Sequence, residues 1–266
     1  MYSMNKYIIL ILIIVILFLI FYNYLWKIEK YQEKSIYTAI IIEPREHKSL
    51  EFVMTNFTDN LDERWNFIVF HGNKNEEFVN NIIKNKLQNQ IHRIKLLNLN
   101  VDNLTINDYN ALFYDKSFYD NIPTEVFLVF QTDTIICKNF KDNIYKFIEY
   151  DYSGAPWTDG NVGNGGLSLR RKSKMLEILE KCGDRKYYNS EEKSYWNEDM
   201  IFSNVLCSDL LQLNKPNFEN SKEFSTETVY SDKSFGMHAP WKHINEDNIK
   251  SINEYCPDLN TLINLQ

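Results

Sequence analysis

The feature that most constrains the fold is a series of apolar runs that alternate with helical segments in the first half of the chain. These runs, rich in β-branched and aromatic residues, occupy 37–42, 65–70, 94–99 and 126–130. Helices are predicted between them, ending near Asn60 and covering about Glu76 to Asn89. Continuous apolar runs indicate strands buried on both faces, and their alternation with helices predicts a parallel sheet. We therefore predict an α/β domain with a Rossmann-like nucleotide-binding half.

A long apolar segment precedes this domain. Residues 7–26 are apolar except for Asn23, and a helix of that length rises about 30 Å, enough to cross a bilayer core. No small residues follow as in a cleaved signal peptide, so we predict an uncleaved signal anchor after a short tail over 1–6. Residues 27–35 are charged and predict a stalk, and 36–266 predicts one globular domain. Lysines flank the segment on both sides, so the charge rule does not decide its orientation.

Composition excludes several classes of function. The net charge of −7 and a pI near 5.4 leave no basic stripe for a polynucleotide, so we expect no nucleic-acid partner. No GxGxxG follows the first strand, which argues against NAD. The four cysteines are far apart and show no CxxC spacing, so they predict neither a zinc site nor an obvious disulfide framework.

The run Phe127–Phe130 opens into Gln131-Thr132-Asp133 before a second apolar run begins. Ligands of open α/β sheets bind beyond the carboxyl ends of strands. A carboxylate placed there can hold a divalent cation against a phosphate, although Asp133 can equally cap a turn. The first strand likewise ends in Glu43-Pro44-Arg45. Glu43 and Arg45 are candidates to bind a nucleotide, and the alternative for Arg45 is a solvated loop.

Scarce glycine is concentrated in one later segment. Residues 161–170 hold three of the eight glycines, including Gly165 and Gly166, which implies backbone that approaches another group closely. Just before it, Tyr152 and Trp157 are candidates to stack on a sugar ring, with burial in the core as the alternative.

Two further polar groups are candidates for chemistry. Glu198 and Asp199 begin a helix predicted to run to about Leu213, where they either act as a general base or only stabilise the helix amino terminus. His238 lies in a loop between Gly and Pro residues and is either a metal or phosphate ligand or a surface histidine.

The order of the phrases FQTD, DYSGAPW, VGNGGLSLR, NEDMIF and GMHAPW resembles that of inverting GT-A fold glycosyltransferases over about residues 36–243. The nearest resemblance is to an uncharacterised glycosyltransferase-like family with members in large DNA viruses. It implies a single GT-A-like domain with a mixed central sheet, a nucleotide-sugar donor, and a glycan, protein or lipid acceptor. Such enzymes are usually type II membrane proteins with a lumenal catalytic domain, or here virion-associated.

The resemblance also implies roles for residues. Asp133 matches the last carboxylate of a DxD motif that holds Mn²⁺ or Mg²⁺, and His238 a late histidine of the same metal shell. Gly165 and Gly166 match a glycine pair below the donor sugar and acceptor, and Asp199 matches the base. Gln131 stands where the first carboxylate of DxD is usual, which removes one anionic contact to the metal. Its remaining implied role is a hydrogen bond to the ribose. The alternatives are a catalytically degenerate glycan-binding relative and a nucleotide-sugar hydrolase.

Overall fold

The computed structural model describes residues 12–22, 36–189 and 194–266, which belong to two units, Met1–Ser35 and Ile36–Gln266. In the first unit, residues 12–22 form a helix with exposed apolar side chains. The rest of the predicted anchor, the tail over 1–6 and the stalk over 27–35 lie outside the described residues. No helix in the described ranges is both long and apolar enough to cross a bilayer.

The second unit is built on a central six-stranded sheet with the order β3-β2-β1-β4-β7-β6. Its strands are β1 (Tyr37–Ile42), β2 (Trp65–His71), β3 (Ile94–Asn98), β4 (Val126–Phe130), β6 (Tyr152–Ser153) and β7 (Leu167–Arg171). β1 to β4 run parallel, whereas β7 is antiparallel to β4 and to β6. The predicted strands and the mixed central sheet are confirmed.

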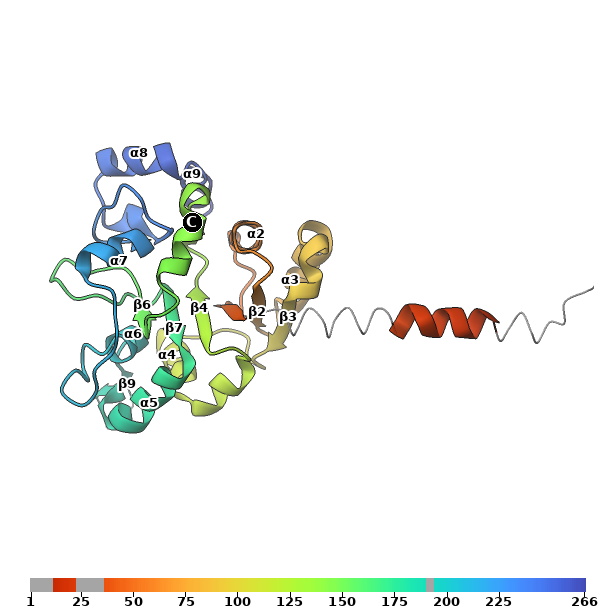
Figure 1. The fold of residues 1–266 in the computed structure, drawn as a ribbon, viewed down its shortest axis with the longest axis horizontal. Coiled ribbons are helices and arrows are strands. Elements are labelled where there is room, and N and C mark those ends of the chain that lie inside the picture. Colours follow the sequence, from red (N-terminus) through yellow and green to blue (C-terminus); the bar gives the residue numbers. More distant parts are fainter. Residues whose placement is uncertain (1–11, 23–35, 190–193) are drawn as a thin grey trace, which may run out of the picture. The chain divides into compact units, whose positions relative to one another are not determined.

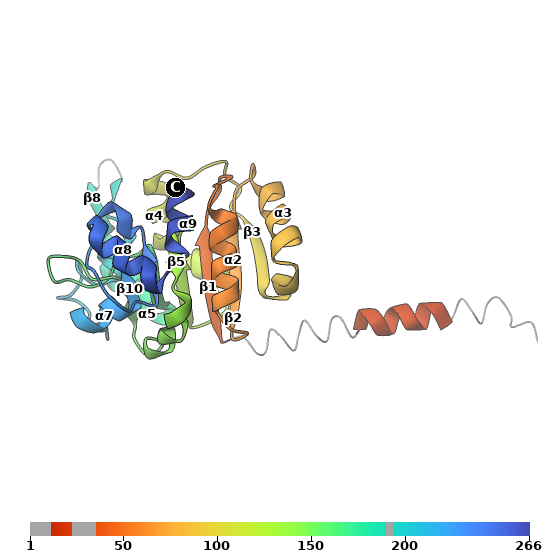
Figure 2. The same cartoon turned by 90° about the horizontal axis from the view of Figure 1, so that it is seen from above.

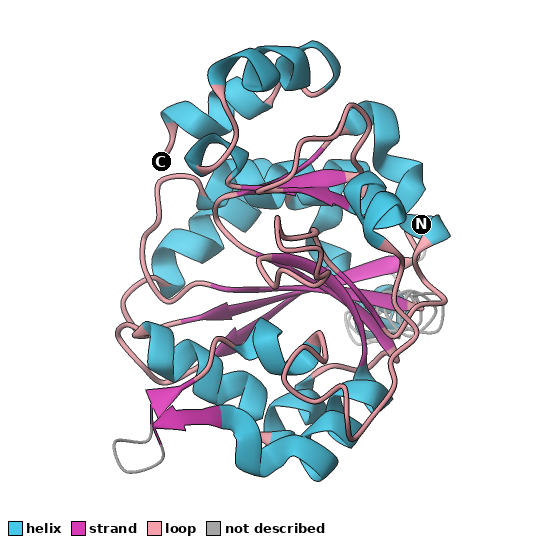
Figure 3. Ribbon diagram, turned by 90° about the vertical axis from the view of Figure 1, so that its left-hand side faces the viewer, coloured by secondary structure: helices cyan, strands magenta, loops and turns pink. Residues whose placement is uncertain are grey.

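Helices cover both faces of this sheet (Figure 3). They are α2 (Leu50–Asn60), α3 (Glu76–Lys86), α4 (Ile106–Tyr114), α5 (Lys172–Cys182), α6 (Glu198–Phe202), α7 (Phe218–Phe224), α8 (Glu246–Tyr255) and α9 (Leu259–Asn264). Short 3₁₀ helices are η1 (Gln88–Arg93), η2 (Lys116–Asn121), η3 (Lys138–Lys146), η4 (Gly183–Lys186) and η5 (Pro240–Lys242). α2 and α3 lie next to β1 to β3 (Figure 2), and α8 and α9 lie across β4 and β7 from α4 and α5 (Figure 1).

The apolar run of β1 is continuous because both of its faces are buried. Ala39 and Ile41 pack in the core cluster of α2 and α3, and Ile40 and Ile42 pack in the cluster of α4 and α5. Successive side chains of a strand point to opposite faces, so a strand between two helical layers needs apolar residues at every position.

A second, smaller sheet completes the domain with the order β10-β11-β5. β5 (Thr134–Ile136) follows β4 after a turn and pairs antiparallel with β11 (Gly236–His238), which pairs with β10 (Ser225–Thr226). The register places His238 opposite Thr134, next to the turn that carries Asp133. β8 (Tyr187–Asn189) and β9 (Ser194–Tyr195) form a separate hairpin.

Two predictions from the sequence are wrong. The helix expected from Glu198 to about Leu213 ends at Phe202, because Asn204 has φ +67° and a left-handed residue cannot continue a right-handed helix. The cysteines are paired, as Cys137–Cys256 and Cys182–Cys207, with Cα atoms 5.0 and 6.2 Å apart. These partners are 119 and 25 residues apart, so only the tertiary fold brings them together.

Candidate active site

A cavity of about 580 Å³ opens beyond the carboxyl ends of β1 and β4. The two strands are neighbours. The crossover that leaves β1 through α2 lies on one face of the sheet and the crossover that enters β4 through α4 lies on the other, and such a point is the usual place for a ligand in an open α/β sheet. The volume is within the range of small-molecule sites. The cavity is lined by the predicted residues Glu43, Arg45, Gln131, Asp133, Gly165, Gly166, Glu198, Asp199 and His238.

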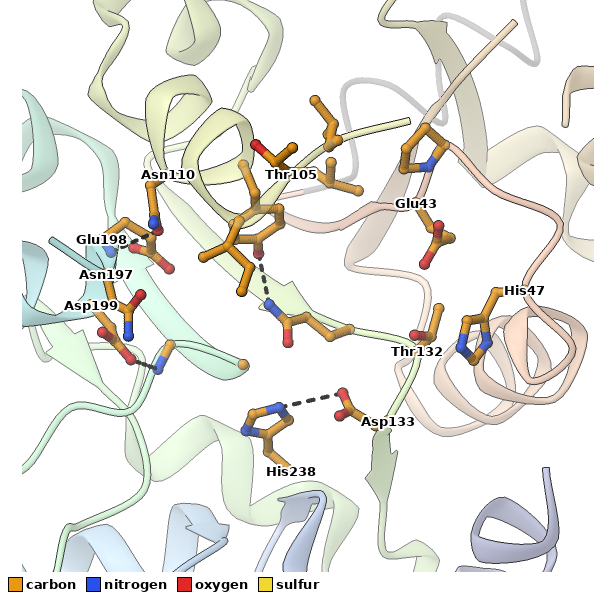
Figure 4. A pocket seen from close by; sticks show the side chains of 18 of the residues that line it. Glu43, His47, Thr105, Asn110, Thr132, Asp133, Asn197, Glu198, Asp199 and His238 are labelled. Atoms are coloured by element: carbon orange, nitrogen blue, oxygen red, sulfur yellow. Dashed lines mark hydrogen bonds and ion pairs between the residues drawn. The ribbon is translucent and has the colours of Figure 1, made fainter. Parts of the chain in front are cut away.

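One wall of the cavity carries Asp133, which lies between a histidine and a lysine. Oδ1 of Asp133 lies 3.3 Å from Nε2 of His238 (Figure 4). Oδ2 accepts a hydrogen bond from Lys242 Nζ at 2.9 Å. On its other side, Nδ1 of His238 lies 2.9 Å from Oε1 of Glu227. Burial opposes the ionised form, but His238 and Lys242 hold the pKa of Asp133 well below its usual range. Burial lowers the pKa of His238, but Asp133 and Glu227 raise it to about 9 overall.

Asp133 and His238 were predicted to share a divalent cation, and their geometry fits this. Two adjacent ligands of an octahedral ion of Mg²⁺ size lie about 3 Å apart, close to the separation of Oδ1 and Nε2. No group of three or more histidine, cysteine or acidic side chains suited to a metal occurs in the described parts of the chain. Two protein ligands fit an ion that takes its remaining ligands from a diphosphate and water.

The glycines of residues 161–170 approach protein groups very closely. A Cβ on Gly166 would lie 2.3 Å from Cε1 of His238, and one on Gly165 would lie 2.7 Å from Oε1 of Glu198. The predicted need for close approach is therefore met by His238 and Glu198, while both glycines also line the cavity. This segment connects the two charged walls.

The opposite wall holds the acidic pair at the start of α6. Glu198 is buried and forms two hydrogen bonds, of 2.6 and 2.7 Å, with the guanidinium of the fully buried Arg170. Asp199 is next to it, and its Oδ2 accepts from the Gly165 N–H at 3.0 Å. Burial and the charge of Glu198 raise the pKa of Asp199 to about 7.

The ends of β1 and β4 supply the remaining polar groups. Buried Glu43 holds the exposed Arg45 side chain through two bonds of 2.8 Å. The side-chain amide of Gln131 donates to the Tyr109 hydroxyl at 3.0 Å, which leaves its carbonyl oxygen as an acceptor. Burial raises the pKa of Tyr109, so this hydroxyl remains protonated.

The two predicted acceptor residues are not in the cavity. Tyr152 is fully buried, and its hydroxyl donates to the carbonyl of Gly163 at 2.8 Å, so its predicted contact with an acceptor is wrong. The sequence does not distinguish an aromatic ring that packs in the core from one that faces a cavity. The ring of Tyr152 packs against the guanidinium of Arg170. Trp157 lies in a hairpin turn and does not line the cavity.

Several residues of the site were not expected from the sequence. Arg170, Glu227, Tyr109 and Lys242 all act through contacts across the fold. Of these four, only Arg170 could have been noticed in the sequence, as a charged residue at the end of an apolar strand. The structure pairs that strand with β4. The exposed Trp196 directly precedes Asn197, which lines the cavity, and it too was not predicted.

Solved structures share this fold. GlyE, a glycosyltransferase of Streptococcus pneumoniae TIGR4, aligns with a TM-score of 0.54 and 13% identity, over 86% of this chain and 62% of GlyE. This chain therefore spans less than two thirds of GlyE, and the likeness shows a glycosyltransferase-like fold. The likeness to GlyE does not show membership of the glycosyltransferase-like family with viral members that the sequence resembles.

Two other solved structures are less similar. HddC from Yersinia pseudotuberculosis aligns with a TM-score of 0.45 and 15% identity, over 82% of this chain and 99% of HddC. The mannosyltransferase PcManGT from Pyrobaculum calidifontis, in complex with GDP-Man and Mn²⁺, aligns with a TM-score of 0.47 and 10% identity, over 73% of this chain and 61% of PcManGT.

Comparison at the level of sequence identifies a family. No curated protein matches the chain. Residues 93–238, which include β4, the glycine segment, the acidic pair and His238, match the family described as protein of unknown function (DUF5672). Because this match covers more than half of the chain, the chain belongs to the DUF5672 family.

Proposed function

We propose that this protein is a glycosyltransferase that moves a sugar from a nucleotide-sugar donor to an acceptor hydroxyl. The observation that carries the proposal is the contrast between Asp133, surrounded by cations, and Asp199, whose pKa is raised to about 7, on two walls of one cavity. A carboxylate near pH 7 is suited to general base catalysis. The glycosyltransferase-like fold supports the same reaction.

The proposed step is a single displacement with inversion. The oxygen of Asp199 that is not bonded to Gly165 takes the proton of the acceptor hydroxyl, while the oxygen of that hydroxyl forms a bond to the anomeric carbon. The bond from this carbon to the diphosphate breaks on the opposite face, and the electron pair leaves with the nucleoside diphosphate. Both oxygens of Glu198 are held by Arg170, so we assign the base to Asp199 and a positioning role to Glu198.

In this proposal the donor diphosphate lies at the wall of Asp133. Lys242 brings positive charge to it, and Arg45 brings a guanidinium from the end of β1. A Mn²⁺ or Mg²⁺ ion held by Asp133 and by Nε2 of His238 would take the place of the Nε2 proton and neutralise more of the charge on the leaving diphosphate. The free carbonyl oxygen of Gln131 is proposed to accept a hydrogen bond from a ribose hydroxyl.

Membrane anchoring through residues 7–26, with the catalytic domain in the lumen or on the virion, belongs to the same proposal. The exposed apolar side chains of residues 12–22 support it. Alkaline carbonate extraction of membranes that contain the full-length chain tests this point. Recovery of the chain in the soluble fraction would contradict anchoring.

The direct test is a panel of nucleotide sugars incubated with the full-length chain and either Mn²⁺, Mg²⁺ or chelator, with nucleoside diphosphate release as the readout. We expect release from one donor that chelator and Asp133→Ala suppress, while Asp120→Ala, an exposed aspartate outside the cavity, has no effect. Release that acceptors do not accelerate would indicate a hydrolase. No release from any donor would favour the degenerate glycan-binding relative.

A further inference from the structure

Glu227 is a buried carboxylate that does not line the cavity and has no part in the reaction proposed above. Its residue is 6% exposed, and it directly follows β10, two strands from the turn that carries Asp133. Oε1 lies 2.9 Å from Nδ1 of His238, and Oε2 has no hydrogen-bond partner among the described residues. A buried carboxylate is costly unless it is paired, and His238 is the partner of Glu227. The question is what this pair does for His238.

The surroundings of His238 determine which ring nitrogen carries a hydrogen. Nδ1 faces Oε1 of Glu227 and, at 3.1 Å, Oδ1 of Asn164. That oxygen of Asn164 also accepts from the Gly166 N–H at 3.0 Å, which fixes the orientation of the amide. Nδ1 therefore faces two acceptors and no donor, so it must carry a hydrogen.

The other nitrogen then points toward Asp133. Nε2 lies 3.3 Å from Oδ1 of Asp133, at the edge of the cavity. The ring reaches this position because Gly166 has no side chain, since a Cβ there would lie between 2.3 and 2.5 Å from three ring atoms. Histidines that ligate metals nearly always donate their second N–H to a carboxylate or carbonyl, which fixes the tautomer and the ring orientation.

We propose that Glu227 is a positioning residue that, together with Asn164, keeps the hydrogen of the neutral His238 ring on Nδ1, so that Nε2, once it has given up its own proton, forms a two-ligand site for a divalent cation with Oδ1 of Asp133. The inference rests on the proposed function for the cation at Asp133 and His238 and for the diphosphate that completes the site, and it adds the role of Glu227. The alternative is that Glu227 only stabilises the fold, which would not require a particular tautomer.

The first test measures Mn²⁺ binding to the full-length chain by electron paramagnetic resonance of the free ion, without donor or acceptor. We expect Glu227→Ala to weaken Mn²⁺ binding about 10- to 100-fold. Glu227→Gln keeps an acceptor for Nδ1–H and should lose less. Glu223→Ala removes a partly exposed carboxylate from the same region and should bind Mn²⁺ like the wild type. Equal Mn²⁺ affinity in Glu227→Ala and wild type would overturn the proposal.

The second test needs no variant to fold. In ¹⁵N-histidine spectra of the wild type without metal, at a pH where the ring is neutral, His238 should show a protonated Nδ1 and an unprotonated Nε2. A protonated Nε2 would overturn the proposal, whatever the variants show. Both tests are independent of turnover, so absence of donor cleavage would contradict the proposed function and leave this inference standing.

Discussion

The two walls of the cavity contain the same residue type in opposite environments. Asp133 has the imidazole of His238 and the ammonium of Lys242 within 3.3 Å, and its pKa is lowered. Asp199 is as buried as Asp133 but has the carboxylate of Glu198 beside it, and the guanidinium of Arg170 is paired with Glu198. Burial and the charge of Glu198 therefore raise its pKa to about 7. The chemical difference between them comes entirely from their neighbours.

This difference separates two roles. A carboxylate that stays ionised attracts cations, whereas one that titrates near neutral pH exchanges protons. The sequence shows each only as an acidic residue next to an apolar run, and the division of roles follows from Arg170 and Lys242, which reach the site from elsewhere in the fold.

The largest expected effect is that of Asp199→Asn. Removal of a general base typically lowers the rate about 10²- to 10⁴-fold, so transfer should fall by that factor at saturating donor, metal and acceptor. Substrate binding should change little, because the amide has nearly the same shape. Steady-state kinetics of acceptor glycosylation measure it, and full transfer by Asp199→Asn would rule out Asp199 as the base.

The same variant reports on stability. A pKa raised from 3.8 to about 7 on folding means that the ionised form is disfavoured in the native state, so the stability present below pH 4 is lost as pH rises to about 7. Asp199→Asn has no such loss. Its melting temperature should exceed that of the wild type at pH 8 and approach it toward pH 4, and the opposite trend would contradict the raised pKa.

The next largest effect concerns the buried ion pair of Arg170 and Glu198, which lies beside Asp199. Arg170→Met leaves the buried Glu198 carboxylate uncompensated, and breaking a buried pair in this way costs about 3–5 kcal/mol of unfolding free energy. The matched control is Arg170→Met/Glu198→Leu, which removes both charges and should recover much of the loss. Urea denaturation measures both variants. Equal losses in the single and double variants would mean that packing, not charge, is the cause.

The predictable parts of the fold are those that local sequence determines. The runs that become β1, β2, β3 and β4 need apolar side chains on both faces, and that requirement is visible as continuous hydrophobic sequence. The length of the helix that begins at Glu198 was overestimated. The left-handed conformation of Asn204 depends on its surroundings, and the apolar residues beyond it fit a helical pattern equally well.

The site was predictable only in part for a related reason. Residues that follow strands β1 and β4, and the concentrated glycines, could be found because parallel strands end at one edge and glycine permits close approach. Glu227 and Tyr152 could not be assigned, since a buried polar side chain is defined by its partners, here His238 and the Gly163 carbonyl. The disulfide partners were unpredictable for the same reason.

A smaller effect concerns pH and distinguishes the two walls directly. Of the two aspartates only Asp199 titrates near neutrality, so kcat/KM should fall about tenfold for each pH unit below 7, with an apparent pKa near 7. Asp133 remains ionised over that range and should contribute no inflection. Rate profiles from pH 5 to 9 with a single donor measure this. A flat profile across pH 7 would show that Asp199 does not act as a base with the proposed pKa.

The smallest predicted effect is at the exposed aromatic residue that precedes the acidic pair. Trp196 is 40% exposed, packs edge-on against Tyr188 and adjoins Asn197 at the cavity, so we expect it to contact an acceptor near Asp199. Loss of an aromatic contact is worth about 0.5–1.5 kcal/mol, so Trp196→Ala should raise the KM for a glycan acceptor about 2- to 10-fold and leave that for the donor unchanged. Neither tryptophan lines the cavity itself, but Trp157, unlike Trp196, has no chain neighbour in the lining, so Trp157→Ala is the matched control. If instead Trp196→Ala changed only the KM for the donor, the donor and acceptor walls assigned here would have to be exchanged, and Asp133 would become the candidate nearer the acceptor.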